Sequence, residues 1–308
     1  MKKLLIALLL ASTTATVAAQ DSVAPFTIQE TGQGFGSLQE AVSAIGDRNG
    51  TILIASGLYH QCAIQDAGRV AFVAREPGKA VFDGVACEGK ALLVLRGRSA
   101  QVQGLTLENI NVADGNGAGI RLEQGDLSVM QTVFRDSQSG ILSHDDPSAT
   151  VRIDQSTFSG LGYCGDDCAH AIYLGDYGRL IVMRSRFERG TGGHYVKTRG
   201  ARVDITDSSF DDSRGEATNY MIDLSNGSTG MITGNTFVQG ARKENYSGLI
   251  VVAAEGKKHK STGLVIAGND ASLAPGAKAT TFLVDYSGDA VDLEENKLAA
   301  RITRFEER

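Results

Sequence analysis

Eight apolar residues recur along the chain at intervals of 23 to 34 residues, each within a short apolar run. They are Leu107, Phe134, Phe158, Phe187, Phe210, Phe237, Ala271 and Leu298. Turn residues separate these runs, and no long helical periodicity follows Val70. A repeat of this length, with two or three strands per unit and no helix, indicates a parallel β-helix whose coils stack on one another. We therefore predict an all-β solenoid with this column of residues stacked in its interior.

Two further features agree with a solenoid. Asn235, Asn269 and Asn296 recur two positions before the apolar column, as expected for a polar ladder at a corner of the coil. The chain has 37 Gly and only 4 Pro, which suits frequent tight turns between short strands.

A short helix is predicted before the repeats. Residues 37–40 read as a capping box, and Gly46 is a stop signal, so the helix spans about 37–46. Its apolar face is formed by Leu38, Ala41, Val42 and Ile45. Such a helix would cover the open sheet edge at the start of the solenoid. Residues 20–36 are polar and Gly-rich, and we expect them to be irregular.

The first 19 residues have the features of a secretory signal peptide. Lys2 and Lys3 precede a short apolar run, and small residues ending at Ala19 follow it. The run is too short to span a bilayer, so we expect no membrane insertion. The remaining residues, 20–308, form one β-helix domain, exported to the periplasm or the extracellular space.

The charge balance argues against nucleic acid as a partner. The chain has 30 Lys and Arg against 36 Asp and Glu, and two of the lysines fall in the signal peptide. Nucleic-acid binding requires a basic surface. The stretch from Arg179 to Arg202 is nevertheless locally basic, with Glu188 as its one acidic residue. An acidic polysaccharide or oligosaccharide is therefore the expected partner, and the sequence gives no oligomeric state.

All four cysteines lie in the exported part, where disulfides persist. Of the three pairings available we favour Cys62–Cys87, about one repeat apart, together with Cys164–Cys168, which would close a small loop. Zinc is the rival interpretation for Cys164 and Cys168, but no second Cys or His pair lies at zinc spacing.

Several stretches resemble the right-handed parallel β-helix proteins of the pectate-lyase-like superfamily. They are Ser37-Leu-Gln-Glu-Ala-Val to Gly57-Leu-Tyr59, and Gly104-Leu-Thr-Leu107. The resemblance covers roughly residues 34–300 and implies a right-handed coil. The stretches Gly193-His-Tyr-Val-Lys-Thr-Arg199 and Tyr220-Met-Ile-Asp-Leu224 are similar to a bacterial branch of such exported proteins, which implies no particular reaction.

Strand alternation predicts a column of polar side chains on the outside of the solenoid. Because Ile172, Val196 and Ile222 should face inward, their neighbours should face outward. The predicted outward residues are Tyr173, Tyr195, Lys197, Arg199 and Asp223. We also expect His144 near Arg199, and we expect His170 and His194 to align at the starts of their strands.

These residues could support β-elimination of a uronic acid, as in polysaccharide lyases on this fold. Lys197 would act as the base, Arg199 would bind the carboxylate as a fork, and Tyr173 or a histidine would protonate the leaving oxygen. Asp223, His194, His170, Tyr195 and His144 would bind substrate. We expect no cofactor. Such lyases often use calcium, and acidic pairs in turns, such as Asp145-Asp146 and Asp211-Asp212, offer suitable oxygens.

Two alternatives stay open for this outward column. It could bind a polysaccharide without cleaving it, or it could be a structural feature in which Lys197 and Asp223 form a surface ion pair. Hydrolysis ranks lower, because it needs paired carboxylates on one face and Asp223 stands alone there. If Lys197 is the base, its replacement by Ala should abolish turnover and leave the melting temperature nearly unchanged, because an outward side chain adds little stability.

Overall fold

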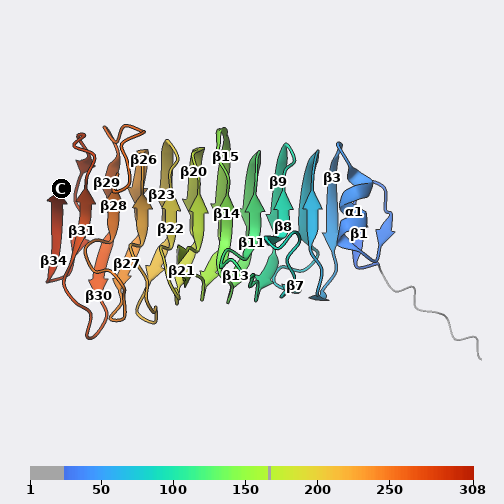
Figure 1. The fold of residues 1–308 in the computed structure, drawn as a ribbon, viewed down its shortest axis with the longest axis horizontal. Helices are drawn as coiled ribbons and strands as arrows, with labels where there is room; N and C mark the ends of the chain where they lie inside the picture. The colour runs from blue at the N-terminus through green and yellow to red at the C-terminus, as the bar shows by residue number, and fades with distance from the viewer. Residues whose placement is uncertain (1–23, 166–167) are drawn as a thin grey trace, which may run out of the picture.

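The computed structural model describes residues 24–165 and 168–308, so the predicted signal peptide lies outside the described residues. The chain winds into a parallel β-solenoid in which the coils add one strand each to three long sheets (Figure 1). Sheet A has 12 strands, whereas sheets B and C have 10 each. The predicted all-β, right-handed parallel β-helix is confirmed.

The strands of sheet A, in their spatial order, are β2 (Gly34–Phe35), β1 (Phe26–Ile28), β3 (Asn49–Ile54), β6 (Arg69–Ala74), β9 (Ser99–Gln103), β12 (Asp126–Met130), β15 (Asp146–Asp154), β20 (Tyr177–Met183), β23 (Arg202–Thr206), β26 (Thr229–Thr233), β29 (Val265–Ala267) and β32 (Asp292–Leu293).

The strands of sheet B, in chain order, are β4 (Gly57–Tyr59), β7 (Ala80–Asp83), β10 (Leu105–Glu108), β13 (Val133–Arg135), β16 (Thr157–Ser159), β21 (Arg186–Glu188), β24 (Ser209–Asp211), β27 (Thr236–Gln239), β30 (Asp270–Leu273) and β33 (Lys297–Leu298). Those of sheet C are β5 (Ala63–Gln65), β8 (Ala91–Leu95), β11 (Ala118–Leu122), β14 (Ser139–Ser143), β19 (Ile172–Leu174), β22 (Val196–Thr198), β25 (Ile222–Leu224), β28 (Ile250–Val252), β31 (Thr280–Asp285) and β34 (Ile302–Glu307).

The predicted apolar column lies inside sheet B. All eight of its residues pair in register from β10 to β33, and the five phenylalanines are buried. Their neighbouring rings stack with centroids 4.7 to 5.1 Å apart. This spacing matches the separation of hydrogen-bonded strands, so ring stacking and the strand ladder reinforce each other.

The predicted asparagine ladder is also present. The Oδ1 atom of Asn269 accepts from the backbone N–H of Asn235 at 2.9 Å, and Oδ1 of Asn296 accepts from that of Asn269 at 3.0 Å. Both Asn235 and Asn269 are buried. Each amide therefore satisfies backbone groups at a corner that the sheets leave unpaired.

Helix α1 (Leu38–Ile45) covers the N-terminal end of the solenoid, as predicted (Figure 1). Ser37 is its N-cap and accepts from the N–H of Glu40, while Gly46 ends the helix with φ 64°. The expectation of an irregular segment before it is wrong. Strands β1 and β2 form antiparallel pairs that extend sheet A, because Phe26 and Ile28 bury their side chains in the core.

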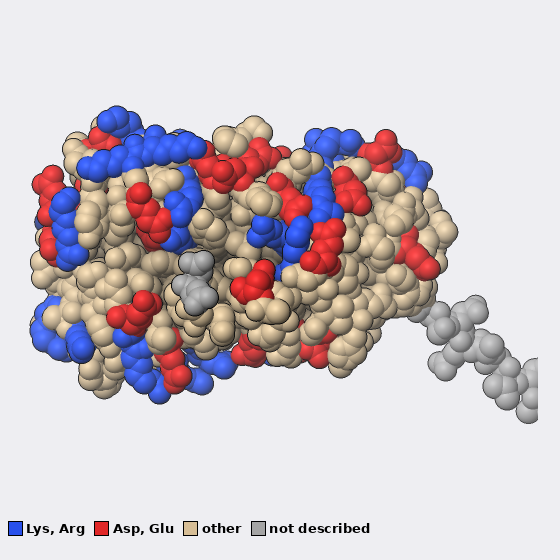
Figure 2. All heavy atoms as spheres, in the orientation of Figure 1, with Lys and Arg blue, Asp and Glu red and all other residues tan. Residues whose placement is uncertain are grey.

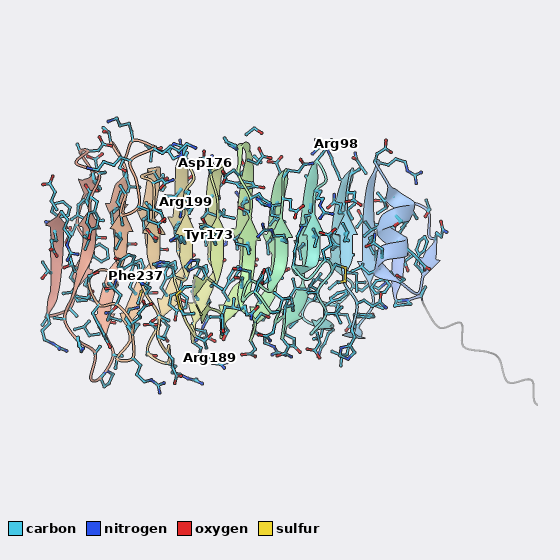
Figure 3. The ribbon with its side chains drawn as sticks, in the orientation of Figure 1. Arg98, Tyr173, Asp176, Arg189, Arg199 and Phe237 are labelled. Carbon is cyan, nitrogen blue, oxygen red and sulfur yellow. A yellow bond between two sulfur atoms is a disulfide. The ribbon has the colours of Figure 1, made fainter. Side chains whose placement is uncertain are left out.

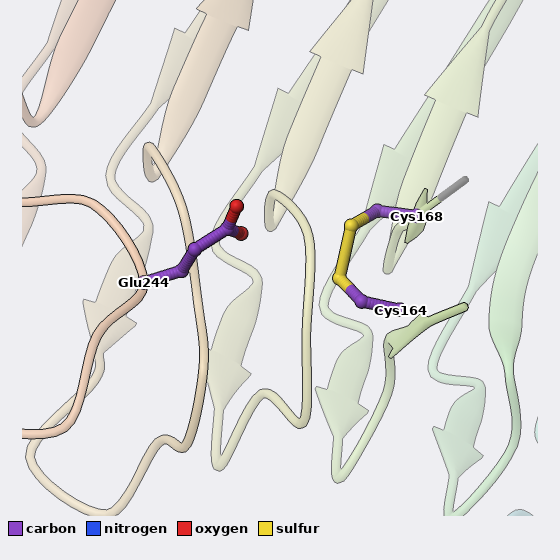
Figure 4. Close-up of side chains that lie close together, drawn as sticks. All are labelled: Cys164, Cys168 and Glu244. Atoms are coloured by element: carbon purple, nitrogen blue, oxygen red, sulfur yellow. A yellow bond between two sulfur atoms is a disulfide. The ribbon is translucent and has the colours of Figure 1, made fainter. Parts of the chain in front are cut away.

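Both predicted disulfides, Cys62–Cys87 and Cys164–Cys168, are present. The second closes a small hairpin formed by β17 (Tyr163–Cys164) and β18 (Cys168–Ala169) in the connection between β16 and β19 (Figure 4). Because its sulfurs are bonded to each other, they cannot serve as thiolate ligands, so the rival zinc interpretation is wrong.

Candidate functional site

A groove of about 1000 Å³ lies over the outer face of sheet C. It extends from Lys90, next to β8, to Glu255, beyond β28, and so runs along the solenoid axis. Lys and Arg side chains interleave with Asp and Glu on this face of the molecule (Figure 2). A shallower hollow of about 550 Å³ lies on sheet A, but none of the predicted site residues lines it. The groove is therefore the candidate site.

One outward column of sheet C runs beneath this groove. In register it contains Ile64, Val94, Arg121, Leu142, Tyr173, Lys197, Asp223, Val251 and Val284. Its two ends are apolar, and its polar side chains gather in the middle. The predicted register of Tyr173, Lys197 and Asp223 is confirmed, although the roles assigned to them stay predictions.

Tyr173 and Arg199 contact each other across neighbouring coils at mid-length of the solenoid (Figure 3). Nε of Arg199 donates to the phenol oxygen of Tyr173 at 2.8 Å. The phenol oxygen thus accepts from a cation, which leaves its own proton available to a third group. Both side chains line the groove.

Glu255 completes the site and was missed by sequence reasoning. One carboxylate oxygen accepts from Nζ of Lys197 and the other accepts from Nη2 of Arg199. Burial raises the pKa of Glu255, but the hydrogen bonds and charges of Lys197 and Arg199 outweigh it and hold this pKa below its usual value. Two cations, Lys197 on β22 and Arg199 just after it, therefore share a single carboxylate in the groove.

The loop 253–264 brings Glu255 to this position. It connects β28 to β29 and folds back toward earlier coils. Nε2 of His259 lies 2.8 Å from Oδ1 of Asp176, and Lys258 donates to the same carboxylate. The interval from Phe237 to Ala271 is the longest between the repeats; it signals a long loop but not the loop's path.

Asp223 points outward as predicted, but it is only 1% exposed and does not line the groove. Its Oδ2 lies 3.5 Å from Nζ of Lys197 and accepts from Oγ of Ser225 at 2.8 Å. Burial raises the pKa of Asp223 to about 6, against the opposing charge of Lys197. The expectation that Asp223 is open to substrate is wrong; the side chain supports Lys197 from below.

His170 and His194 align just before β19 and β22, with ring centroids 4.8 Å apart and ring planes tilted by 31°. The backbone N–H of His194 donates to Nδ1 of His170 at 2.9 Å, so a neutral His170 carries its proton on Nε2. Burial, followed by the charges of Lys197 and Arg199, lowers the pKa of His170 to about 3. His170 lines the groove as a neutral hydrogen-bond donor.

His194 is 8% exposed, as is His170, and it also lines the groove. Its Nε2 lies 3.6 Å from Oδ2 of Asp223, and its Nδ1 has no partner among the described residues. Burial, with the charges of His170 and Lys197, lowers the pKa of His194 well below its usual value. His144 also lines the groove, where its Nε2 lies 3.0 Å from Nη2 of Arg121.

Tyr195 does not face outward, and that prediction is wrong. The residue precedes β22, where strand alternation does not yet apply, and its side chain is buried among the core aromatics. Its ring packs edge-on to those of Phe187 and Phe210, 6.3 and 6.4 Å away. Its hydroxyl donates to Oδ1 of Asp212 at 2.8 Å. Tyr195 therefore supports the fold and does not contact the groove.

Asp212, one of the acidic turn residues considered as calcium ligands, is fully buried. Nζ of Lys243 lies 3.1 Å from its Oδ2, and both side chains are 0% exposed. Thr218 also donates its hydroxyl to this carboxylate. This pair ties together the connections before β25 and β28, and it leaves no free oxygens for calcium.

The described residues contain one group of three metal-type side chains within 4.8 Å of one another: Cys164, Cys168 and Glu244 (Figure 4). The disulfide removes two of these as ligands. At the other acidic pairs, Asp146 accepts from the N–H groups of Gly125 and Ser148. The carboxylate of Asp146 therefore caps backbone turns.

Comparison with known proteins settles the family. A family model described as "Right handed beta helix region" matches residues 90–272. The chain belongs to this right-handed β-helix family. A solved structure, "Geobacillus virus E2 - ORF18", is similar over 87% of this chain and 56% of that chain, at 9% identity and a TM-score of 0.48. This β-helix thus spans little more than half of that chain. No curated protein matches the present β-helix chain.

The family and the fold bound the function of this β-helix. They support a carbohydrate-active or a structural role, and they do not select between these roles. The two disulfides are consistent with an exported protein. Among the described residues, no helix has the length and apolar character that a membrane crossing requires.

Proposed function

We propose that this protein is exported to the periplasm or the extracellular space and binds an acidic polysaccharide along the groove of sheet C. One observation carries the proposal: Lys197 and Arg199 together hold the carboxylate of Glu255, one oxygen each, inside an open groove. A uronate carboxylate of the polymer has the same chemistry. It would replace Glu255 between the two cations.

The surroundings of the cation pair suit a sugar. His170 presents a neutral donor on the groove wall, and the Tyr173 ring offers an apolar face with a polar edge. The groove runs along the solenoid axis, so an extended polymer can pass over successive coils about 4.8 Å apart. The charge at the site is local, which is compatible with a chain of net charge −6.

A second candidate function is β-elimination on the bound uronate, favoured by the bond between Arg199 and Tyr173. Arg199 would neutralise the carboxylate and so acidify the adjacent C–H group, while the Tyr173 hydroxyl would protonate the leaving oxygen. Lys197 is the candidate base. Its ammonium lies between two carboxylates, an arrangement that suits a cation holding an anion better than a proton acceptor. Binding therefore ranks before cleavage.

The proposal is tested by titrating the protein with polygalacturonate, alginate and hyaluronate, with dextran as the neutral control. We expect an acidic polymer to bind and dextran not to bind. Arg199→Gln should weaken the binding of the acidic polymer about tenfold, because it removes a charge-assisted hydrogen bond. If none of the acidic polymers binds, the proposal is wrong.

The same mixtures distinguish binding from cleavage. Elimination creates an unsaturated uronate, whose ultraviolet absorbance would grow with time. Tyr173→Phe should then abolish this growth while leaving binding nearly intact, since the Tyr173 hydroxyl would act in the chemical step. If polymers bind and no absorbance develops, the lyase function is excluded for those polymers and binding alone remains.

A further inference from the structure

Arg121 is the cation of the groove for which no carboxylate partner is found among the described residues. Its side chain leaves β11 in the outward column, between Val94 and Leu142 in the neighbouring coils. Both neighbours are buried and belong to a small apolar cluster on the outside of sheet C. The guanidinium therefore stands against an apolar floor, where an unpaired charge costs more than it would in open solvent.

The other groove cations are already paired. Lys90 lies 3.0 Å from Glu88 and 2.8 Å from Glu123, while Lys197 and Arg199 share Glu255. In the part of the chain that the structure describes, no carboxylate oxygen lies within 4.0 Å of Arg121. Arg121 thus differs in kind from its neighbours: its charge is available to a ligand without displacing an internal anion.

The Arg121 head is also held in place. Its Nη2 lies 3.0 Å from Nε2 of His144, and its Nε is buried without a partner among the described residues. A buried donor without a partner indicates that a water, an ion or a ligand group completes the site. An arginine fork fixed by a neighbour loses less freedom on binding a carboxylate or a sulfate than a mobile one does.

Two acidic side chains line the same part of the groove, and both are engaged by backbone groups. Oδ1 of Asp114 accepts from the N–H of Asn116 at 3.0 Å, and Oδ1 of Asp145 accepts from that of Asp176 at 2.7 Å. Their charge opposes a second anion nearby. A ligand anion at this end of the groove must therefore contact the guanidinium directly. The subsite thus accepts an anion only at the guanidinium of Arg121.

We infer that Arg121 is a second anion subsite, so that the groove binds acidic groups on two separated sugar units of one polysaccharide. The inference rests on the proposed function and deepens it. Between Arg121 and Lys197 the outward column passes through Leu142 and Tyr173, so the two subsites lie three coils apart, roughly 14 Å. The preferred ligand is an oligosaccharide with acidic groups on several units, because a single uronate cannot occupy both subsites at once.

The test uses galacturonate and alginate oligomers of increasing length, titrated calorimetrically into the full chain. The affinity of the wild type should show a step, an abrupt increase with oligomer length, once an oligomer is long enough to span both subsites. Arg121→Gln should remove this step and weaken the binding of the long oligomers about tenfold. Arg199→Gln should weaken oligomers of every length. Arg152→Gln is the matched control, because Arg152 is an outward strand arginine without an ion pair on the far sheet A.

Each result decides a separate point. If Arg121→Gln binds long oligomers as the wild type does, the second subsite is refuted and the proposed function stands. If no acidic oligomer binds the wild type, both proposals are refuted. Arg121→Lys provides a second variant that keeps the charge and loses the fork; it should give an intermediate step, and the absence of any difference between Arg121→Lys and Arg121→Gln at long oligomers would refute the charge of residue 121 as the basis of the subsite. The melting temperature of each variant verifies its fold.

Discussion

Nζ of Lys197 lies 3.5 Å from Oδ2 of Asp223, and both side chains are buried on the outside of the coil. The pair is therefore not the solvated surface ion pair that strand alternation suggests. Removal of Lys197 would leave the Asp223 carboxylate buried with the hydroxyl of Ser225 as a hydrogen-bond donor and Nε2 of the neutral His194 3.6 Å away. The pKa of Asp223 is already raised to about 6 by burial.

Lys197→Ala should lower the free energy of unfolding by about 3 kcal/mol, because it leaves a buried carboxylate unpaired. This expectation replaces the nearly unchanged melting temperature predicted from the sequence. Chemical denaturation measures the difference, with Lys260→Ala as control because Lys260 is 84% exposed. Adding Asp223→Asn should recover part of the loss. A loss equal to that of the control would place Lys197 in solvent.

The His170 pKa predicts a pH effect on stability. The folded ring titrates at about 3 and the unfolded ring near 6.5, so between these values the unfolded chain alone binds the proton. Stability is thus lost as the pH falls from 6.5 toward 3, at on the order of 1 kcal/mol per pH unit for one proton.

His170→Asn removes this titration while keeping an acceptor for the N–H of His194. Relative to the wild type, its free energy of unfolding should increase steadily as the pH falls below 6.5. Asp223 titrates in the opposite sense in an overlapping range, since its raised pKa makes stability fall as the pH rises from about 4 to about 6. Because both proteins contain Asp223, its contribution cancels in the difference between their free energies of unfolding. A constant difference between pH 7 and pH 4 would contradict a buried neutral His170.

The interior phenylalanine column should dominate the stability of the solenoid. Phe187→Ala removes a fully buried ring that stacks on two others and should cost roughly 3 to 5 kcal/mol. Phe305→Ala, on the last strand, should cost far less because Phe305 is 43% exposed. Thermal unfolding followed by circular dichroism compares the two variants. Equal losses would mean that the column is not the core.

The buried pair of Lys243 and Asp212 makes a further prediction about the connections before β25 and β28. Burial lowers the pKa of Lys243, whereas the charge and the hydrogen bond of Asp212 raise it, so the buried ammonium depends on Asp212. Lys243→Met should destabilise the protein by about 3 kcal/mol, since Asp212 then keeps only hydroxyl partners. Hydrogen exchange should rise first in residues 212–221 and 240–249. Unchanged exchange there would show that the pair does not hold these connections.

The coil and its interior were predictable from the sequence because inward side chains must be apolar once per repeat. Phe134 and Phe237 obey this rule, as does the ladder of Asn235 and Asn269. Strands β1 and β2 escaped notice because runs of three and two residues carry too little alternation. Tyr195 was misplaced for a related reason: it lies in a turn, where the two-residue period has not begun.

The candidate site was only partly predictable. Alternation and coil stacking placed Tyr173, Lys197 and Asp223 in one column, since both follow from strand geometry. The burial of Asp223 and the presence of Glu255 depend on the path of the loop 253–264, which no periodicity encodes. Arg121 lies in the same column, but the structure is needed to see that none of the described carboxylates pairs with it.

The replacement Glu255→Gln is the most direct test of an acidic-polysaccharide groove. It keeps the size of the side chain and removes the carboxylate that Lys197 and Arg199 share, so both cations become available to the polymer. Measured by calorimetry against polygalacturonate or alginate, whichever binds the wild type, the variant should bind about tenfold more tightly, and dextran should still not bind. Unchanged or weaker binding of the acidic polymer would show that these cations do not receive its carboxylates.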